Sequence, residues 1–96
     1  MRIVVQPPLT AFIDDDAGYR AWLAANSGGF VLNTTRSPRA DYLMLHRAGC
    51  RHISGDDTRS WTKNYAKVCG PSQALLDEWA TSTVSCAADR CPFCLR

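Results

Sequence analysis

The sequence predicts an α+β fold: a small antiparallel sheet with a hairpin around residues 30–53, packed with two helices at about 15–26 and 71–81, and stapled by a structural Zn²⁺. Three observations predict it. Runs rich in β-branched and aromatic residues flank a turn that contains proline, a pattern typical of paired strands. Apolar residues recur at helical spacing in two other segments. A Cys-x-x-Cys at 91–94 follows a His-x3-Cys at 46–50, which indicates a metal site.

Proline, aspartate and glycine residues indicate where the first strand and the first helix begin and end. Residues 2–5 (RIVV) form a short β-type run that Pro7 and Pro8 stop, because proline cannot continue a strand ladder. An Asp cluster then supplies the cap and the first-turn negative charge of a helix at 15–26. Asn-Ser-Gly-Gly at 26–29 ends this helix, since these residues tolerate left-handed geometry. Its expected apolar stripe consists of Tyr19, Ala21, Trp22 and Ala25.

The hairpin is predicted from two strand-like segments, GFVLNTTRSP and DYLMLHRAGC, which pair across residues 36–40. Alternation along the second strand separates its side chains onto two faces. One face carries Tyr42, Met44 and His46, and the other carries Leu43 and Leu45. A short return strand is expected at 50–54, after a turn at Gly49.

The second half contains a strand, a helix and a loop. Within WTKNYAKVCG, the part from Tyr65 to Cys69 is interpreted as a strand. The helix at 71–81 opens at Pro71 or Ser72 and has Leu75, Leu76 and Trp79 at helical spacing. The remaining residues, 83–96, are expected to form a loop that ends in the Cys-x-x-Cys.

Length and composition limit the class of protein. Ninety-six residues leave no room for two independent cores, so residues 1–96 are taken as one domain. A content of 46% hydrophobic and 21% charged residues is that of an ordinary globular protein. No apolar run approaches the roughly 20 residues that span a bilayer. The first ten residues are too short and too broken for a signal peptide, so we expect a cytoplasmic protein without membrane contact.

The five cysteines favour a metal site over the other uses of thiols. A disulfide framework requires an even number and an exported chain, and neither condition is met. A thioredoxin-like couple needs a helix that begins at its first thiol, and only Leu95 and Arg96 follow Cys94. Zinc fits better, because a two-residue gap lets two thiolates face one ion. The candidate ligands form a Cys₃His set: His46, Cys50, Cys91 and Cys94.

Other ligand sets remain open at this point. Cys86 could replace His46 or Cys50, since its spacing to Cys91 is also suitable. His52 shares a strand face with Cys50 and is a further candidate. Cys69 is interpreted as a small buried hydrophobic residue.

The stretch LHRAGCRHI, followed by a helix and then RCPFC, resembles the small Ada-type zinc modules of bacterial DNA-repair proteins and of some nucleases. The resemblance covers about residues 40–96. It implies His46, Cys50, Cys91 and Cys94 as ligands. The stretch GFVLNTTRSPRADYLMLHRAGC is also similar to small bacterial domains that accompany nuclease or restriction modules. The two resemblances imply an association with a nuclease, restriction or repair system. The methyl-accepting members use cysteine as the nucleophile where this chain has His46. Imidazole cannot replace a thiolate in that role, so no alkyl transfer is expected.

The positive charge is concentrated in the middle third of the chain. Residues 36–67 carry seven Lys and Arg against three Asp, a net charge of +4, whereas residues 1–35 and 68–96 each have a net charge of −1. A closed zinc site activates no water, so function is expected on the surface that the zinc organises. Basic side chains among aromatic ones predict contacts with DNA, modified DNA included. The predicted contacts are Arg36, Arg39, Arg47, Arg51, Trp61, Lys63, Tyr65 and Lys67.

Simpler interpretations compete with these contacts. Trp61 and Tyr65 could pack in the core, and Arg36 and Arg39 could belong to a solvated turn. Asn33, Thr34 and Thr35 could add neutral hydrogen bonds to a phosphate.

Two other function classes stand beside DNA binding. The first is a zinc-stapled protein–protein adaptor without nucleic-acid binding. The second is an enzyme with a nuclease cluster of His46, His52 and Asn64. Because no catalytic carboxylate spacing supports that cluster, we predict no catalytic residues.

Overall fold

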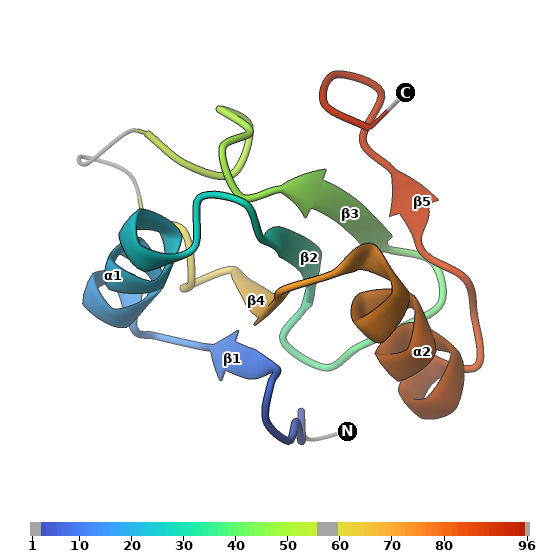
Figure 1. Ribbon diagram of the computed structural model, residues 1–96. Coiled ribbons are helices and arrows are strands. Elements are labelled where there is room, and N and C mark those ends of the chain that lie inside the picture. Colours follow the sequence, from blue (N-terminus) through green and yellow to red (C-terminus); the bar gives the residue numbers. More distant parts are fainter. Residues whose placement is uncertain (1–2, 56–59, 96) are drawn as a thin grey trace.

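Five strands and two helices make up the fold in the computed structural model, which describes residues 3–55 and 60–95 (Figure 1). The α+β class predicted from the sequence is confirmed. In chain order the elements are β1 (Thr10–Phe12), α1 (Asp16–Ala25), β2 (Phe30–Thr35), β3 (Leu43–Arg47), β4 (Tyr65–Gly70), α2 (Gln73–Val84) and β5 (Asp89–Arg90). Within these two ranges no helix is both long and apolar enough to cross a bilayer.

All five strands belong to one sheet with the order β1-β4-β2-β3-β5. Every pair is antiparallel except β3 and β5, which are parallel. The predicted hairpin is confirmed, since β2 pairs directly with β3 and Val31 lies opposite His46. On its other side β2 pairs with β4, where Val31 lies opposite Cys69 and Asn33 lies opposite Lys67. The central strand therefore joins residues that are far apart in the chain.

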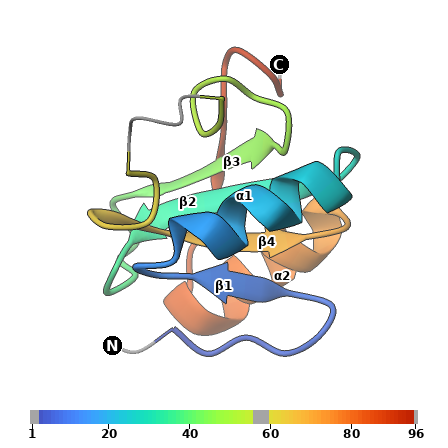
Figure 2. The same ribbon diagram turned by 90° about the vertical axis from the view of Figure 1, so that its left-hand side faces the viewer.

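The two helices cover opposite faces of the sheet, α1 on one and α2 on the other (Figure 2). The alternation of β2 explains this arrangement, because successive side chains point to opposite faces. Val31 packs in the cluster on the α1 side with Tyr19, whereas Leu32 packs on the α2 side with Leu76. As predicted, Leu43 and Leu45 share the α2 face, and Met44 lies on the other.

The first helix buries a different stripe from the one predicted. Tyr19 is fully buried and Trp22 and Leu23 are partly buried, whereas Ala21 and Ala25 are exposed. Three and four residues after Tyr19 lie one turn along the same helix face, so the large side chains at those positions meet the sheet. The alanines lie beside this stripe and face solvent.

Both helices begin at side-chain caps that the sequence predicts. The Asp15 carboxylate accepts a hydrogen bond from the Gly18 amide at 2.9 Å, and the Ser72 hydroxyl accepts one from the Leu75 amide at 3.3 Å. The second helix runs to Val84, three residues past the predicted end. Val84 packs against the α2-side core, and this packing overrides the weak helix propensity of the preceding Thr-Ser-Thr.

The predicted strand at 2–5 is wrong for residues 3–5; Arg2 lies outside the described residues. Residues 3–5 have no regular structure, and the first strand instead follows the prolines. Here the indole Nε1 of Trp79 donates a hydrogen bond to the Val4 carbonyl at 3.0 Å. A side chain of α2 therefore satisfies this backbone in place of a strand partner, while Ile3 and Val5 pack against the core.

Two predictions around the cysteines are also corrected. Residues 50–54 form a turn rather than a return strand, with the Ile53 amide bonded to the Cys50 carbonyl at 3.1 Å. The predicted loop at 83–96 contains the two-residue strand β5. The turn at 50–54 closes on its own backbone, whereas β5 forms because it pairs with the distant strand β3, a contact that no local pattern indicates.

Candidate metal centre and adjoining pocket

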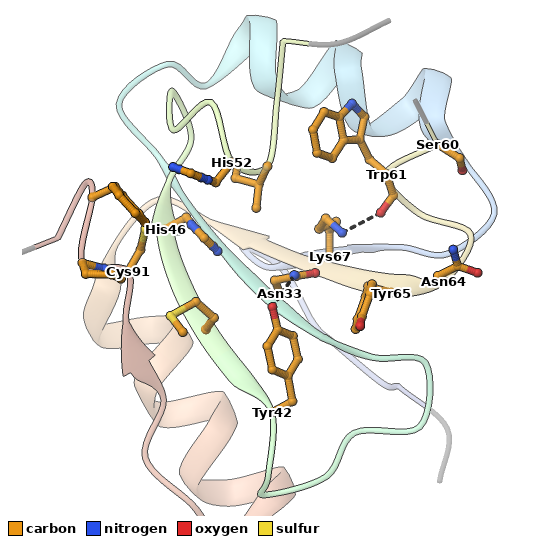
Figure 3. A pocket seen from close by; sticks show the side chains of 14 residues that line it. Asn33, Tyr42, His46, His52, Ser60, Trp61, Asn64, Tyr65, Lys67 and Cys91 are labelled. Atoms are coloured by element: carbon orange, nitrogen blue, oxygen red, sulfur yellow. Dashed lines mark hydrogen bonds between the residues drawn. The ribbon is translucent and has the colours of Figure 1, made fainter. Parts of the chain in front are cut away.

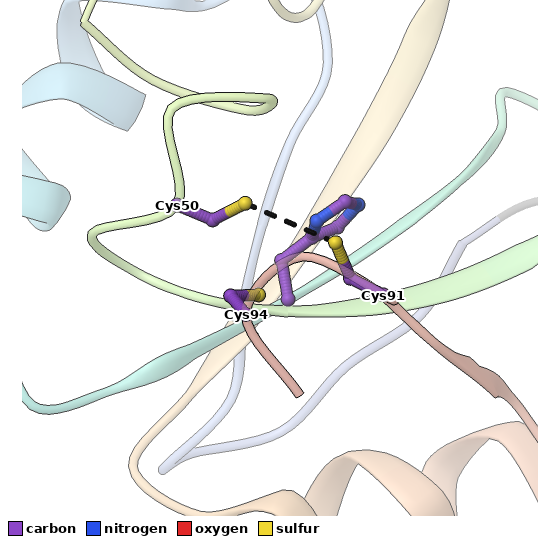
Figure 4. Close-up of side chains that lie close together, drawn as sticks. Cys50, Cys91 and Cys94 are labelled. Atoms are coloured by element: carbon purple, nitrogen blue, oxygen red, sulfur yellow. Dashed lines mark hydrogen bonds between the residues drawn. The ribbon is translucent and has the colours of Figure 1, made fainter. Parts of the chain in front are cut away.

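Four side chains of the metal-ligating types meet at one end of the sheet. His46 comes from β3, Cys50 from the turn after it, and Cys91 and Cys94 from the segment after β5. Each offers one ligand atom, and these atoms all lie within 4.8 Å of one another. Figure 4 shows the three labelled cysteines pointing toward one another. The group could therefore hold a metal ion, and it is the quartet predicted from the spacing.

Backbone hydrogen bonds to β3 place the second cysteine pair. The Cys91 amide donates to the Leu45 carbonyl at 2.9 Å, which continues the parallel pairing of β3 and β5. The Arg47 amide donates to the Sγ of Cys94 at 3.2 Å. The Arg47 side chain donates from Nε to the Cys94 carbonyl at 2.9 Å and lies over the Phe30 ring. The C-terminal segment is thus fastened to the strand that carries His46.

The thiols experience opposing effects. Burial raises the pKa of Cys50 to about 11, and the neighbouring Cys94 and Cys91 thiols add to this shift although the His52 amide opposes it. Burial also disfavours the Cys91 thiolate, but hydrogen bonds from the Phe93 and Cys94 amides and from neighbouring thiols outweigh it and lower the pKa of Cys91. Amides aimed at sulfur favour thiolates, and several thiolates in one buried place require a cation.

His46 is suited to a ligand role at neutral pH. Burial lowers the pKa of His46 to about 4, and the nearby His52 and Lys67 act in the same direction. The imidazole is therefore neutral and keeps a lone pair for a metal. Its Nδ1 is buried and has no hydrogen-bond partner within residues 3–55 and 60–95.

The alternative ligands lie elsewhere. Cys86 is partly exposed, and its Sγ lies 3.7 Å from the Ala40 carbonyl oxygen. His52 is exposed and stacks on the Phe93 ring, with centroids 4.3 Å apart. Cys69 is fully buried in the core on the α1 side, as the sequence predicts. In the described part of the chain, the metal-ligating group includes none of these three residues.

A pocket of about 710 Å³ opens directly beside this cluster (Figure 3). Its floor is the part of the sheet face that α1 leaves uncovered. One wall is formed by His52, Ile53, Ser60, Trp61 and Asn64, and another by Pro92 and Phe93 of the cysteine segment. His46 and Cys91 belong to both the cluster and the pocket. The floor side chains are Asn33, Met44, His46, Tyr65 and Lys67.

Polar groups lie at the bottom of the pocket. Asn33 is 9% exposed and Lys67 is 2% exposed. The Asn33 Nδ2 donates to the Tyr42 hydroxyl at 2.9 Å, and the Lys67 ammonium donates to the Trp61 carbonyl. Lys67 also lies about 6 Å from the centres of two aromatic rings, those of Tyr19 and Tyr65. Such packing holds the ammonium in a defined place.

Aromatic rings surround this polar floor. The Tyr42 and Tyr65 rings contact each other with centroids 5.4 Å apart, and Trp61 lies on the opposite side (Figure 3). The stacked His52 and Phe93 rings connect the two walls. Trp61 is buried, Tyr65 is 43% exposed and Phe93 is 67% exposed. The lining combines flat apolar surfaces with a few convergent polar groups, as ligand sites do.

The residues predicted to contact DNA divide into two groups. Trp61, Tyr65 and Lys67 line the pocket, while the remaining five lie outside its lining. Of these, Arg51 and Lys63 are exposed, and each directly precedes a residue that lines the pocket, His52 and Asn64 respectively.

The other three predicted arginines have partners within the chain. Arg36 forms an ion pair with Asp14 at 2.6 Å and donates to the Lys63 carbonyl at 2.7 Å. Arg39 forms an exposed ion pair with Asp41 at 3.2 Å. Arg47 is bonded to the cysteine segment as described above. All three arginines are therefore engaged in intramolecular contacts.

Several pocket residues were missed or assigned otherwise. Asn33, Thr34 and Thr35 were candidates for neutral hydrogen bonds to a phosphate, but Asn33 lies at the pocket floor and Thr34 is fully buried. Phe93, inside the Cys-x-x-Cys, was not considered. Two signals in the sequence could have indicated them. Phe93 is a bulky ring next to the candidate ligands, and Asn33 is an amide within an apolar strand. Strand order, which brings them together, has no local signal.

Comparison of the chain with models of protein families, with curated proteins and with solved structures gives no significant match.

Proposed function

We propose that the chain is a zinc-stabilised module that binds nucleic acid, DNA above all, by accepting one unpaired or flipped base into the pocket. The observation that supports it best is the pocket itself. Its rings offer stacking surfaces, and its amide and ammonium groups offer hydrogen bonds at the bottom. Base–aromatic stacking and hydrogen bonding are the two means by which proteins hold a base out of its stack.

Zinc is the metal that suits the cluster best. Three sulfurs and one imidazole are a common structural set for this ion, and thiolates select it over hard cations. Zinc–sulfur bonds of about 2.3 Å in a tetrahedron place two sulfurs about 3.8 Å apart. The Cys50 and Cys91 sulfurs lie 4.0 Å apart. Four protein ligands leave no position for a substrate, so the ion has a structural role.

Charge favours a nucleic acid over other flat ligands. The Lys67 ammonium lies in the pocket lining and disfavours a cationic guest such as a methylated lysine. Exposed Lys63 and Arg51 lie next in sequence to the lining residues Asn64 and His52, where they can contact the phosphates that flank a bound base. Three other statements stay predictions: the zinc-stapled adaptor function, the Ada-type resemblance, and a nuclease or repair system as partner.

Binding of a fluorescently labelled thymine decamer, followed by anisotropy at low salt, tests the proposal. We expect binding that weakens steeply with added salt, because phosphate contacts release counterions. Lys63→Ala should weaken binding about threefold or more, on the order of one lost phosphate contact. Arg90→Ala removes the same charge from an exposed pair with Asp77, outside the pocket lining, and should leave binding unchanged.

Two results would contradict the proposal. The first is a folded, zinc-loaded protein that binds no decamer at low salt, which would favour the adaptor. The second is an equal loss of decamer affinity in the Lys63 and Arg90 variants, which would mean that binding depends on overall positive charge and not on the pocket.

A further inference from the structure

We infer that the pocket recognises the Watson–Crick edge of the bound base, with Asn33 and Lys67 as the contacting residues. The inference rests on the proposed function and adds which atoms of the nucleic acid are read. It follows from one unsatisfied acceptor and one donor that the sheet holds side by side.

Asn33 supplies the acceptor. Its side chain lies at the pocket floor, and the residue is 9% exposed. Its Nδ2 donates a hydrogen bond to the Tyr42 hydroxyl. The Oδ1 is buried and has no hydrogen-bond partner among the residues that the structure describes. A buried carbonyl oxygen without a donor is unfavourable, so a ligand that brings an N–H to it gains affinity.

Lys67 supplies the neighbouring donor. Asn33 and Lys67 are direct partners on the antiparallel strands β2 and β4 and line the same pocket, so their Cβ atoms lie about 5 Å apart. The bond to the Trp61 carbonyl and the flanking rings of Tyr19 and Tyr65 fix the ammonium. Figure 3 shows the two side chains on the floor between Trp61 and Tyr42. Together they match a ligand with an N–H donor beside an acceptor.

The Watson–Crick edges of bases have this pattern. In thymine the N3–H can meet the Asn33 Oδ1 while the O4 accepts from Lys67; adenine and cytosine offer an amino group beside a ring nitrogen. A phosphodiester group offers acceptors only and would leave the Asn33 oxygen facing oxygen. In a duplex these edges are already paired, so the pocket selects an unpaired or flipped base.

Methylation of thymine N3 provides the sharpest test, because it removes the donor and changes neither charge nor length. We expect a decamer of N3-methylthymidine to bind the wild-type protein about tenfold more weakly than the thymine decamer, an amount typical of one mismatched buried hydrogen bond. A decamer of deoxyuridine lacks only the C5 methyl group and should bind within about threefold.

The variant Asn33→Ala locates the effect. It should bind both decamers with similar affinity, because the acceptor that distinguishes them is gone. Zinc content and thermal melting show whether this variant is folded. The comparison of the two decamers on the wild-type protein does not depend on this variant.

The outcomes separate the two proposals. Equal binding of the thymine and N3-methylthymine decamers would overturn the edge inference and leave base binding intact. Equal binding of the thymine decamer and an abasic strand of the same length would instead overturn the proposal that a base enters the pocket.

Discussion

The Arg47 amide donates a hydrogen bond to the Cys94 sulfur at 3.2 Å, although 47 positions separate the two residues. Through this bond, and through the Cys91 amide on the Leu45 carbonyl, β3 positions both halves of the cluster that could hold a metal ion. The backbone thus prepares the sulfur positions, and metal and fold should be thermodynamically coupled.

The first prediction concerns the ligands. Cys94→Ser should reduce bound zinc from about one ion per chain to a small fraction and lower the melting temperature, because the serine hydroxyl is a poor zinc ligand. The matched control is Cys86→Ser, whose partly exposed thiol lies outside the cluster and should retain zinc. Metal content by mass spectrometry measures both. Equal zinc loss in the two variants would mean that the quartet is misassigned.

The second prediction concerns acid. Hydrogen bonds from Thr62 and from the Trp61 amide lower the pKa of Asp16 from its ordinary value. A carboxyl with a depressed folded-state pKa stabilises the protein above its unfolded pKa, and this contribution is lost as pH falls through the folded value. Asp16→Asn should therefore lower the free energy of unfolding by about 1 kcal/mol at pH 7, because a charge-assisted hydrogen bond becomes a neutral one. The difference in unfolding free energy between this variant and the wild type should become smaller below about pH 4.

Asp15→Asn is the control for this experiment, since asparagine is an equally good helix cap and should be neutral. Metal release on acidification affects all three proteins, so the quantity to compare is the difference in urea-unfolding free energy. A difference that does not change with pH would refute the electrostatic role of Asp16.

The third prediction concerns the α2-side core. Leu76 is fully buried against the sheet, so Leu76→Ala should lower the free energy of unfolding by about 3 kcal/mol through lost burial and a cavity. Its neighbour Leu75 is only partly buried, and Leu75→Ala should cost about 1 kcal/mol. Urea unfolding with saturating zinc measures both; equal costs would contradict the observed orientation of α2.

The fourth prediction concerns Phe93. Its ring is 67% exposed at the pocket wall, so Phe93→Ala should leave zinc content and melting temperature nearly unchanged. It should weaken binding of the thymine decamer about fivefold to tenfold, because a stacking surface is lost. Val4→Ala removes an equally exposed apolar side chain, 65%, that lies outside the pocket lining and serves as the control. Unchanged decamer binding by the Phe93 variant would exclude this ring from the site.

Much of the fold could be predicted because its signals are local. The caps at Asp15 and Ser72, the alternation of β3 and the spacing of Leu76 and Trp79 each involve a few neighbouring residues. Predictions failed where a distant group decided the conformation. Residues 3–5 are held by Trp79 rather than by a strand, and Ala21 faces solvent because the sheet lies under Trp22 and Leu23.

The sequence by itself predicted the four side chains that could hold a metal ion, because thiol and imidazole groups at short spacings are typical ligands. It left Cys86 and His52 open as alternatives, and the tertiary structure places both outside the cluster. Only the tertiary structure decided that Asn33 lies beside Lys67 and that Phe93 lines the same pocket. The reason is that the strand order β1-β4-β2-β3-β5 arises from hydrogen bonds and burial between distant segments. Hydrophobic periodicity specifies which face of a strand is buried, but not which strand becomes its neighbour.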